Sequence, residues 1–231
     1  MSFLPKPLKV LGQPIEATAS TTASTTASTT AIAKISYVAF RDRVRPGDVI
    51  VFTGKDLPSS VVKVATQSDY VHVAIVLSIE PDREDHTCVL LAESHIDMSL
   101  PSVGTGSCSP GVQVQWLEER LKNMKQPVRW AALHPPLNTS ETVKLQAWLW
   151  EIEQNKTSYD FIQAIGAGIG GVVSEKVNQT DLSALFCSEL VTQALKIVGR
   201  VFPEVNPSKT TPVDVMALPC LDHAIEILHE F

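Results

Sequence analysis

The sequence lacks the markers of several protein classes. It has four cysteines in 231 residues, and no two of them form a CxxC pair. So few cysteines at scattered positions exclude a disulfide scaffold and disfavour a structural zinc site. No stretch of about 18 consecutive apolar residues occurs, so the sequence predicts no transmembrane helix. No cluster of Lys and Arg stands out, which argues against nucleic-acid binding.

The first residues also lack an apolar run of the length that a secretory signal peptide needs. Three Asn-x-Ser/Thr sequons begin at Asn138, Asn155 and Asn178, and without a signal peptide we interpret them as chance occurrences. A reducing, cytoplasmic setting is therefore the expectation. The formal net charge of −6 adds little, because mild acidity is compatible with most partners.

A low-complexity segment precedes the rest of the chain. Residues 18–30 repeat Ser, Thr and Ala in a four-residue period and offer nothing large to bury. Such a segment cannot offset the entropy of ordering its own backbone. We therefore predict that residues 1–33 form a disordered tail and that residues 34–231 form one domain. A hydrophobic content of 44% is ordinary for a globular protein and is enough for a core of normal size.

Sequence periodicity in this domain predicts strands first and helices later. Short runs rich in β-branched and apolar residues predict strands within residues 45–54, 70–80, 88–94, 111–117 and 128–135. A Pro-Gly-Asp turn introduces the first of these strands. Apolar residues spaced by three and four predict helices at residues 57–66, 140–154, 160–173 and 182–199. Strands followed by helices are typical of an α+β domain.

Cys187 lies where the helical pattern of residues 188–198 begins. A thiol at a helix N-terminus is favoured as the thiolate by the positive end of the helix dipole. The alternative is a structural cysteine, because free cysteines are among the most buried residues.

His72 interrupts an apolar strand, so its ring needs a hydrogen-bonding partner. Strand alternation places His72 on the same face as Ala74 and Val76. Because Ala74 is small, it leaves room for another group to approach the imidazole. The alternative is a core histidine whose ring is simply satisfied by a neighbour.

Glu93 ends the next predicted strand. If the two strands are neighbours, its carboxylate can orient the imidazole and stabilise its protonated form. His95 is the rival for this role, Asp97 is a weaker one, and a solvated strand-end carboxylate is the alternative. Glu189 is expected in the first helical turn after Cys187, where it either caps the helix or contributes a polar contact to the site.

In combination these segments resemble a known family. RPGDVIVFTG, TQSDYVHVAIVL, LAES, GVQVQWLEERL, SYDF, FCSELV and TTPVDVMAL follow one another between roughly residues 43 and 218. This order resembles the circularly permuted NlpC-type papain-like hydrolases, the YiiX-like group, in which the histidine precedes the cysteine. The resemblance implies a papain-like α+β fold, with an antiparallel sheet packed against helices and the catalytic cysteine at a helix N-terminus.

The resemblance also implies roles for individual residues. Cys187 matches the nucleophile, His72 the base and Glu93 the third polar residue. The positions expected to line the site are Tyr159 in SYDF, Glu189 in the CSE segment and the adjacent Ser188.

The expected activity is acyl transfer through an acyl-enzyme, on an amide or peptide bond and without a metal or cofactor. A lipid ester or amide is the alternative substrate, with residues 164–173 as an apolar wall or, alternatively, a closely packed helix. A non-catalytic binding module is a further alternative. A metal site at His86, Cys88 and His95 is not expected, because these residues lack a recognised ligand spacing. The sequence leaves the substrate and the oligomeric state open.

Overall fold

The computed structural model describes residues 32–54, 68–80, 88–95, 99–122, 124–155 and 179–229, of which residues 179–186 are described by their backbone alone. The chain divides into two units between Ala31 and Ile32, and the fold below belongs to the second unit. Residues 1–31 of the predicted tail and the helices predicted at 57–66 and 160–173 lie outside the described residues.

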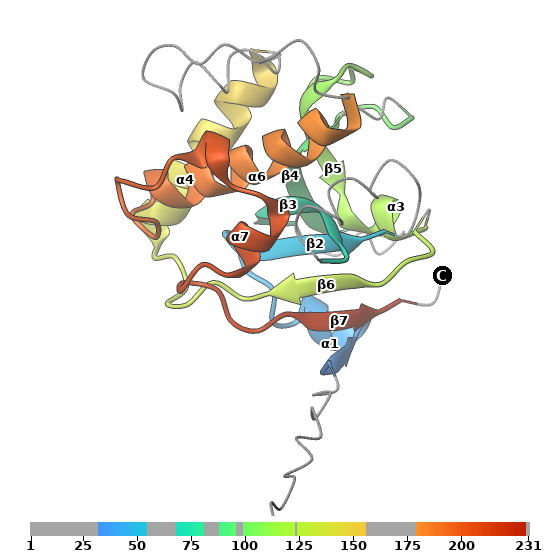
Figure 1. Ribbon diagram of the computed structural model, residues 1–231. Coiled ribbons are helices and arrows are strands. Elements are labelled where there is room, and N and C mark those ends of the chain that lie inside the picture. Colours follow the sequence, from blue (N-terminus) through green and yellow to red (C-terminus); the bar gives the residue numbers. More distant parts are fainter. Residues whose placement is uncertain are drawn as a thin grey trace, which may run out of the picture. The chain divides into compact units, whose positions relative to one another are not determined.

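One mixed sheet of seven strands forms the centre of the described fold, in the order β1-β7-β6-β2-β3-β4-β5 (Figure 1). β1 pairs parallel with β7, and every other neighbouring pair is antiparallel. The strands are β1 (Lys34–Ser36), β2 (Val49–Thr53), β3 (Tyr70–Ile79), β4 (Val89–His95), β5 (Gly111–Trp116), β6 (Val128–Ala131) and β7 (Ile225–Leu228).

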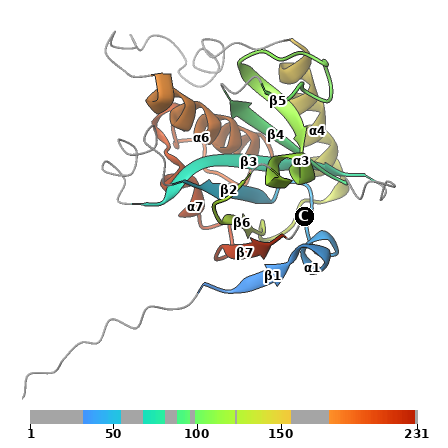
Figure 2. The ribbon, with the colours of Figure 1, turned by 90° about the vertical axis from the view of Figure 1, so that its right-hand side faces the viewer.

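Helices cover both faces of this sheet (Figure 1, Figure 2). The α-helices are α1 (Tyr37–Arg41), α3 (Leu117–Lys122), α4 (Thr139–Gln154), α6 (Gln179–Ile197) and α7 (Pro212–Met216), and η2 (Pro207–Lys209) is a short 3₁₀ helix. Residues of α4, α6 and α7 share one buried apolar cluster with the sheet. Residues of α1 and α3 share a second cluster with it. The sheet is therefore an apolar layer between two groups of helices.

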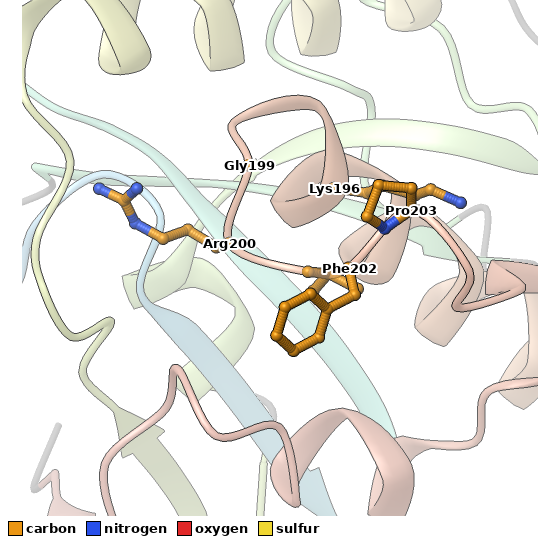
Figure 3. Close-up of a pocket in the computed structure, with 6 residues that line it drawn as sticks. Lys196, Gly199, Arg200, Phe202 and Pro203 are labelled. Carbon is orange, nitrogen blue, oxygen red and sulfur yellow. The ribbon is translucent and has the colours of Figure 1, made fainter.

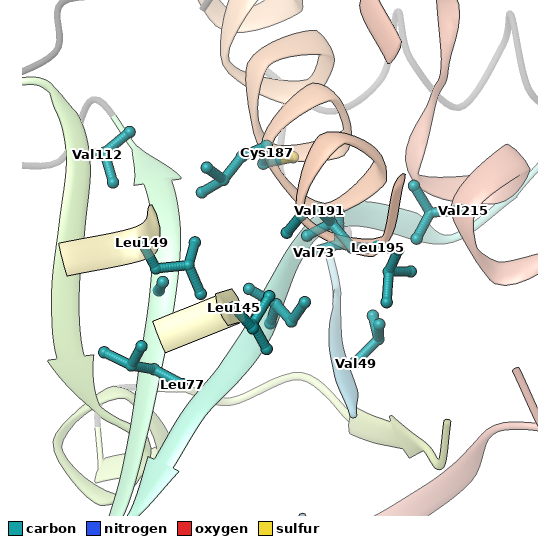
Figure 4. Packing of buried hydrophobic residues seen from close by; sticks show 14 of the residues in the cluster. Val49, Val73, Leu77, Val112, Leu145, Leu149, Cys187, Val191, Leu195 and Val215 are labelled. Atoms are coloured by element: carbon teal, nitrogen blue, oxygen red, sulfur yellow. The ribbon is translucent and has the colours of Figure 1, made fainter. Parts of the chain in front are cut away.

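The central strand β3 shows how the sequence produces this arrangement. Val73 and Ile75 lie in the cluster with α6, whereas Ala74 and Val76 lie in the cluster with α3. A strand buried on both faces reads as a continuous apolar run, because neither face needs polar side chains. Figure 4 shows the first cluster, with Val73 of the sheet facing Leu145 and Leu195 of the helices.

The turn before β2 is fixed by two local features. Gly47 has a φ of 93°, a backbone conformation that favours glycine. The buried carboxylate of Asp48 accepts hydrogen bonds from the indole N–H of Trp130 at 2.8 Å and from the backbone N–H of Leu133 at 2.9 Å. The Pro-Gly-Asp turn predicted from the sequence is confirmed, and its aspartate ties β2 to β6.

The α+β class and the five predicted strands are confirmed, and the helix predicted at residues 140–154 is α4. Asn138, the first of the three sequons, caps α4 in a capping box with Glu141. The strands and helices missed by the sequence analysis are short: β1, β7, α1, α3 and α7 span six residues or fewer. Periodicity needs a longer stretch to be recognised.

The helix predicted at residues 182–199 is α6, but the expectation that Cys187 lies at a helix N-terminus is wrong. α6 begins at Gln179, so Cys187 lies more than two turns inside the helix rather than at its N-terminus. Residues 179–186 read Gln-Thr-Asp-Leu-Ser-Ala-Leu-Phe and contain neither Gly nor Pro. Because nothing in this segment ends a helix and Leu and Ala favour one, the helix extends backwards past the cysteine.

Candidate active site

His72 and Glu93 meet where β3 and β4 stop pairing. The paired residues of these antiparallel strands run from Ile79↔Val89 to Ile75↔Ala92, and beyond the last pair Glu93 is the next residue of β4 while His72 lies three residues further along β3. Nε2 of His72 is 2.7 Å from Oε2 of Glu93, and both side chains are buried. The expectation that the two strands are neighbours, with Glu93 orienting the imidazole, matches this geometry.

Arg120 completes the environment of Glu93 from the other side. Its Nε lies 3.1 Å from Oε1 of Glu93, and its guanidinium lies over the ring of Phe52, 5.5 Å from the centroid. α3 brings Arg120 to this position because Leu117 and Leu121 bury the apolar side of the helix in the sheet. The sequence analysis missed Arg120. Glu93 itself was the signal in the sequence: a carboxylate in an apolar strand is expected to be buried, and a buried carboxylate needs a cation nearby.

Cys187 approaches His72 from α6. It is fully buried, and it shares one side of the helix with Val191 and Leu195 at four-residue spacing (Figure 4). The charge of the Cys187 thiolate and a hydrogen bond to it are the largest influences that raise the pKa of His72. Because Nε2 of His72 faces Glu93, Nδ1 is the ring nitrogen left for the sulfur. The fold therefore joins Cys187, His72 and Glu93 from three elements.

The electrostatics of these groups favour an imidazolium at neutral pH. Burial lowers the pKa of His72, but Cys187 and then Glu93 outweigh it and raise the pKa to about 9. Burial raises the pKa of Glu93, but Arg120 first, then His72 and His95, lower it to about 2. Near pH 7 the site therefore holds a protonated His72 beside an ionised Glu93.

His95, the rival third residue, takes a different position. Its ring lies edge-on to that of His72, with 4.8 Å between the centroids and 89° between the planes. Nε2 of His72 contacts the carboxylate of Glu93, so the geometry favours Glu93 over His95 as the orienting group. Asp97 lies outside the described residues.

Glu189, expected to line the site, instead bonds to a residue of η2. Glu189 is buried and accepts a hydrogen bond from the hydroxyl of Ser208 at 2.7 Å, so it connects α6 to η2. Burial raises the pKa of its carboxyl group. The expected position of Glu189 in a first helical turn is wrong, because α6 begins ten residues earlier, at Gln179.

Ser188 is buried, with its Oγ 4.0 Å from the sulfur of Cys187. Tyr159 lies outside the described residues.

Solvent access to the thiol is restricted in this structure. As whole residues, Cys187 has an exposed fraction of 0% and His72 of 6%. Among the described residues, a cavity of about 580 Å³ lies near the other end of α6, lined by Lys196, Gly199, Arg200, Val201, Phe202 and Pro203 (Figure 3). Lys196 is about 13 Å along the helix from Cys187. In this structure the sulfur itself is closed to solvent.

The described residues contain neither a metal-binding cluster nor a membrane-spanning helix. In this part of the chain, His, Cys, Asp and Glu side chains do not gather in threes in a way that could hold a metal ion. His86, one member of the metal site considered above, lies outside it. None of the described helices combines the length and the apolar character needed to cross a membrane.

The pKa of His72 leads to a prediction about stability. A group whose pKa is higher in the folded state, here about 9 against 6.5, stabilises the fold fully below pH 6.5 and loses that effect as the pH rises through 9. Glu93, with its pKa lowered from 4.5 to about 2, stabilises the fold above pH 4.5 and loses that effect as the pH falls through 2. We expect the free energy of unfolding to be highest and nearly constant between pH 4.5 and 6.5. It is expected to fall by up to about 3 kcal/mol between pH 6.5 and 9.5.

Urea unfolding at a series of pH values measures this loss. His72→Gln is expected to remove most of the decline above pH 6.5, because the variant lacks the imidazolium whose proton is lost in this range. An equally steep decline in the parent and in His72→Gln would contradict the assignment.

Comparisons with known proteins add little to this geometry. No family model matches the chain, and no curated protein matches it. Among the solved structures that it resembles is the crystal structure of metalloprotein YiiX from Escherichia coli O157:H7, DUF1105. The two chains are 16% identical, with a TM-score of 0.45, and the match covers 81% of this chain and 98% of the other. A similarity at this level carries no argument about the site.

Proposed function

We propose that this chain is a cysteine hydrolase of papain-like type that transfers an acyl group through a thioester at Cys187. One observation carries the proposal: the imidazole of His72 is bound by Glu93 at Nε2 and interacts with the thiol of Cys187. A nucleophile, a base and a group that orients the base form the arrangement expected for covalent acyl transfer. Glu93 and His72 are buried, which strengthens their electrostatic interaction.

The proposed reaction uses these residues in order. His72 holds the proton of Cys187, and the thiolate attacks the carbonyl carbon of an amide, forming a carbon–sulfur bond. The carbon–nitrogen bond then breaks as the imidazolium of His72 donates its proton to the leaving amine. Water attacks the thioester while His72 accepts its proton. The carbon–sulfur bond then breaks, the carboxylic acid leaves, and the thiolate of Cys187 and the imidazolium of His72 are restored. Glu93 stays ionised throughout and stabilises the imidazolium.

The position of Cys187 inside α6 favours a second candidate function, a binding module without turnover. In an α-helix the backbone N–H of Cys187 donates to the carbonyl of the residue four positions earlier. It is therefore not free to stabilise an oxyanion, a role that a cysteine at a helix start would allow. The burial of the sulfur also favours a binding module, because a buried thiol is not exposed to a substrate. Hydrolysis requires that substrate binding open the beginning of α6 or that other donors be supplied.

A substrate comparison separates these possibilities. We expect release of product from a short muropeptide-like peptide, because the proposed site acts on an amide, and less release from a phospholipid vesicle. Both reactions are measured by mass spectrometry of the products, with Cys187→Ala as the blank. Greater release of fatty acid than of peptide product would move the proposal to a lipid acyl hydrolase or acyltransferase. Binding of either compound without any release would favour the binding module.

A further inference from the structure

Four ionisable side chains form a continuous line through the interior. Arg120 of α3 contacts Glu93 of β4 at 3.1 Å, and Glu93 contacts His72 of β3 at 2.7 Å. His72 in turn interacts with Cys187 of α6. The exposed fractions of the first three side chains are 13%, 1% and 8%, and Cys187 is fully buried. The line crosses the sheet, from the helix on one face to the helix on the other.

The formal charges of this line sum to zero in the reactive state. Guanidinium and imidazolium supply two positive charges, and carboxylate and thiolate supply two negative ones. The neighbouring titratable group is His95, whose ring contacts that of His72 and whose charge, when present, also lowers the pKa of Glu93. Since an unbalanced charge in a buried site is costly, a neutral residue at position 120 would leave one negative charge in excess.

We infer that Arg120 is a positioning residue: by holding Glu93 ionised and directed at His72, it allows Cys187 to exist as the thiolate. The inference rests on the proposed function. Without Arg120 the site takes up a proton to restore neutrality, and either Cys187 or Glu93 receives it. Both outcomes weaken the thiolate–imidazolium pair at neutral pH. The contact of the guanidinium with the Phe52 ring fixes the direction of the side chain.

The test is the pH dependence of alkylation at Cys187. The full chain is treated with iodoacetamide at a series of pH values, and the label on Cys187 is quantified by peptide mapping, because Cys108 is exposed and reacts as well. In Arg120→Met we expect the midpoint of the rate profile to rise by at least about one pH unit, which slows labelling below the midpoint about tenfold. Arg120→Lys, which keeps the charge, is expected to stay closer to the parent. Arg43→Met is the matched control, since it removes a guanidinium 5.2 Å from the Trp130 ring centroid.

A double variant distinguishes electrostatic positioning from mere structural support. Arg120→Met combined with Glu93→Gln removes both partners of the ion pair. Because Arg120 acts through Glu93, this variant is expected to share the midpoint of Glu93→Gln alone, whereas a role independent of Glu93 would move the midpoint further. This variant also avoids an unpaired buried charge if Arg120→Met alone fails to fold. A structural role would instead lower the melting temperature in every Arg120 variant without moving the midpoint, and that result would overturn the inference. A parent midpoint at or above about 8.5, the ordinary thiol pKa, would instead overturn the proposed function itself.

Discussion

Replacing Cys187 by Ala is expected to reduce hydrolysis to the background rate, a loss of at least about 10³-fold, because the covalent route disappears with the nucleophile. The measurement is product release from the peptide that the parent cleaves. Because Cys187 lies in the apolar cluster beneath α6, the substitution also removes buried volume. Circular dichroism and a thermal melt therefore accompany the assay, so that lost activity is not mistaken for lost structure.

Cys88→Ala is the matched control for this variant. Cys88 is also buried, but it lies in the other apolar cluster, where its backbone N–H donates to Glu118 at 3.0 Å. Both substitutions remove a buried sulfur, and only Cys187→Ala removes the proposed nucleophile. Turnover is expected to survive in Cys88→Ala. Equal turnover in Cys187→Ala and the parent would end the proposal that Cys187 forms a thioester.

Glu93→Gln is expected to lower both stability and turnover. Removing one partner of a buried ion pair leaves the other charge uncompensated, here that of Arg120, at a cost of about 3–5 kcal/mol. The imidazolium of His72 also loses the carboxylate at Nε2, so the pKa of His72 falls from about 9. We expect turnover near pH 7 to drop by about 10²-fold or more, by analogy with other nucleophile–base–carboxylate sites.

Two readouts separate these effects. Urea unfolding gives the change in stability, and the pH profile of hydrolysis gives the change in the site. The alkaline limb of that profile is expected to move to lower pH in Glu93→Gln, because His72 then loses its proton earlier. An alkaline limb that keeps its position would contradict the role of Glu93.

Glu153→Gln is the control for burial of a carboxylate as such. Glu153 of α4 is equally buried, and it accepts hydrogen bonds from the hydroxyl of Ser102 at 2.6 Å and the backbone N–H of Thr105 at 2.9 Å. These uncharged donors connect α4 to the loop before β5. Glu153→Gln is therefore expected to reduce stability without moving the pH profile of hydrolysis.

Local sequence patterns were sufficient for much of the fold. The apolar runs that became β3 and β4 are long enough to be recognised by composition, and the three-and-four spacing of α4 is clear. The polar interruptions of those runs also carried information. His72 and Glu93 stand out because an apolar strand does not accept a polar side chain without a partner, and each supplies the other's partner.

Arg120 illustrates what local patterns do not contain. Its own segment is a short run with charged residues on both sides of the helix, which is typical of a solvated turn. Only the packing of Leu117 and Leu121 against the sheet carries Arg120 to a carboxylate on another strand. Such a contact depends on the relative placement of distant segments, so neither segment encodes it alone.

By itself the sequence determined the α+β class, the strand that carries His72, the next strand that carries Glu93 and the helix that carries Cys187, because periodicity and composition act over neighbouring residues. The tertiary structure alone decided that Arg120 pairs with Glu93 and that the thiol is buried between helix and sheet. These features depend on which surfaces pack together, and packing is settled by the whole domain at once.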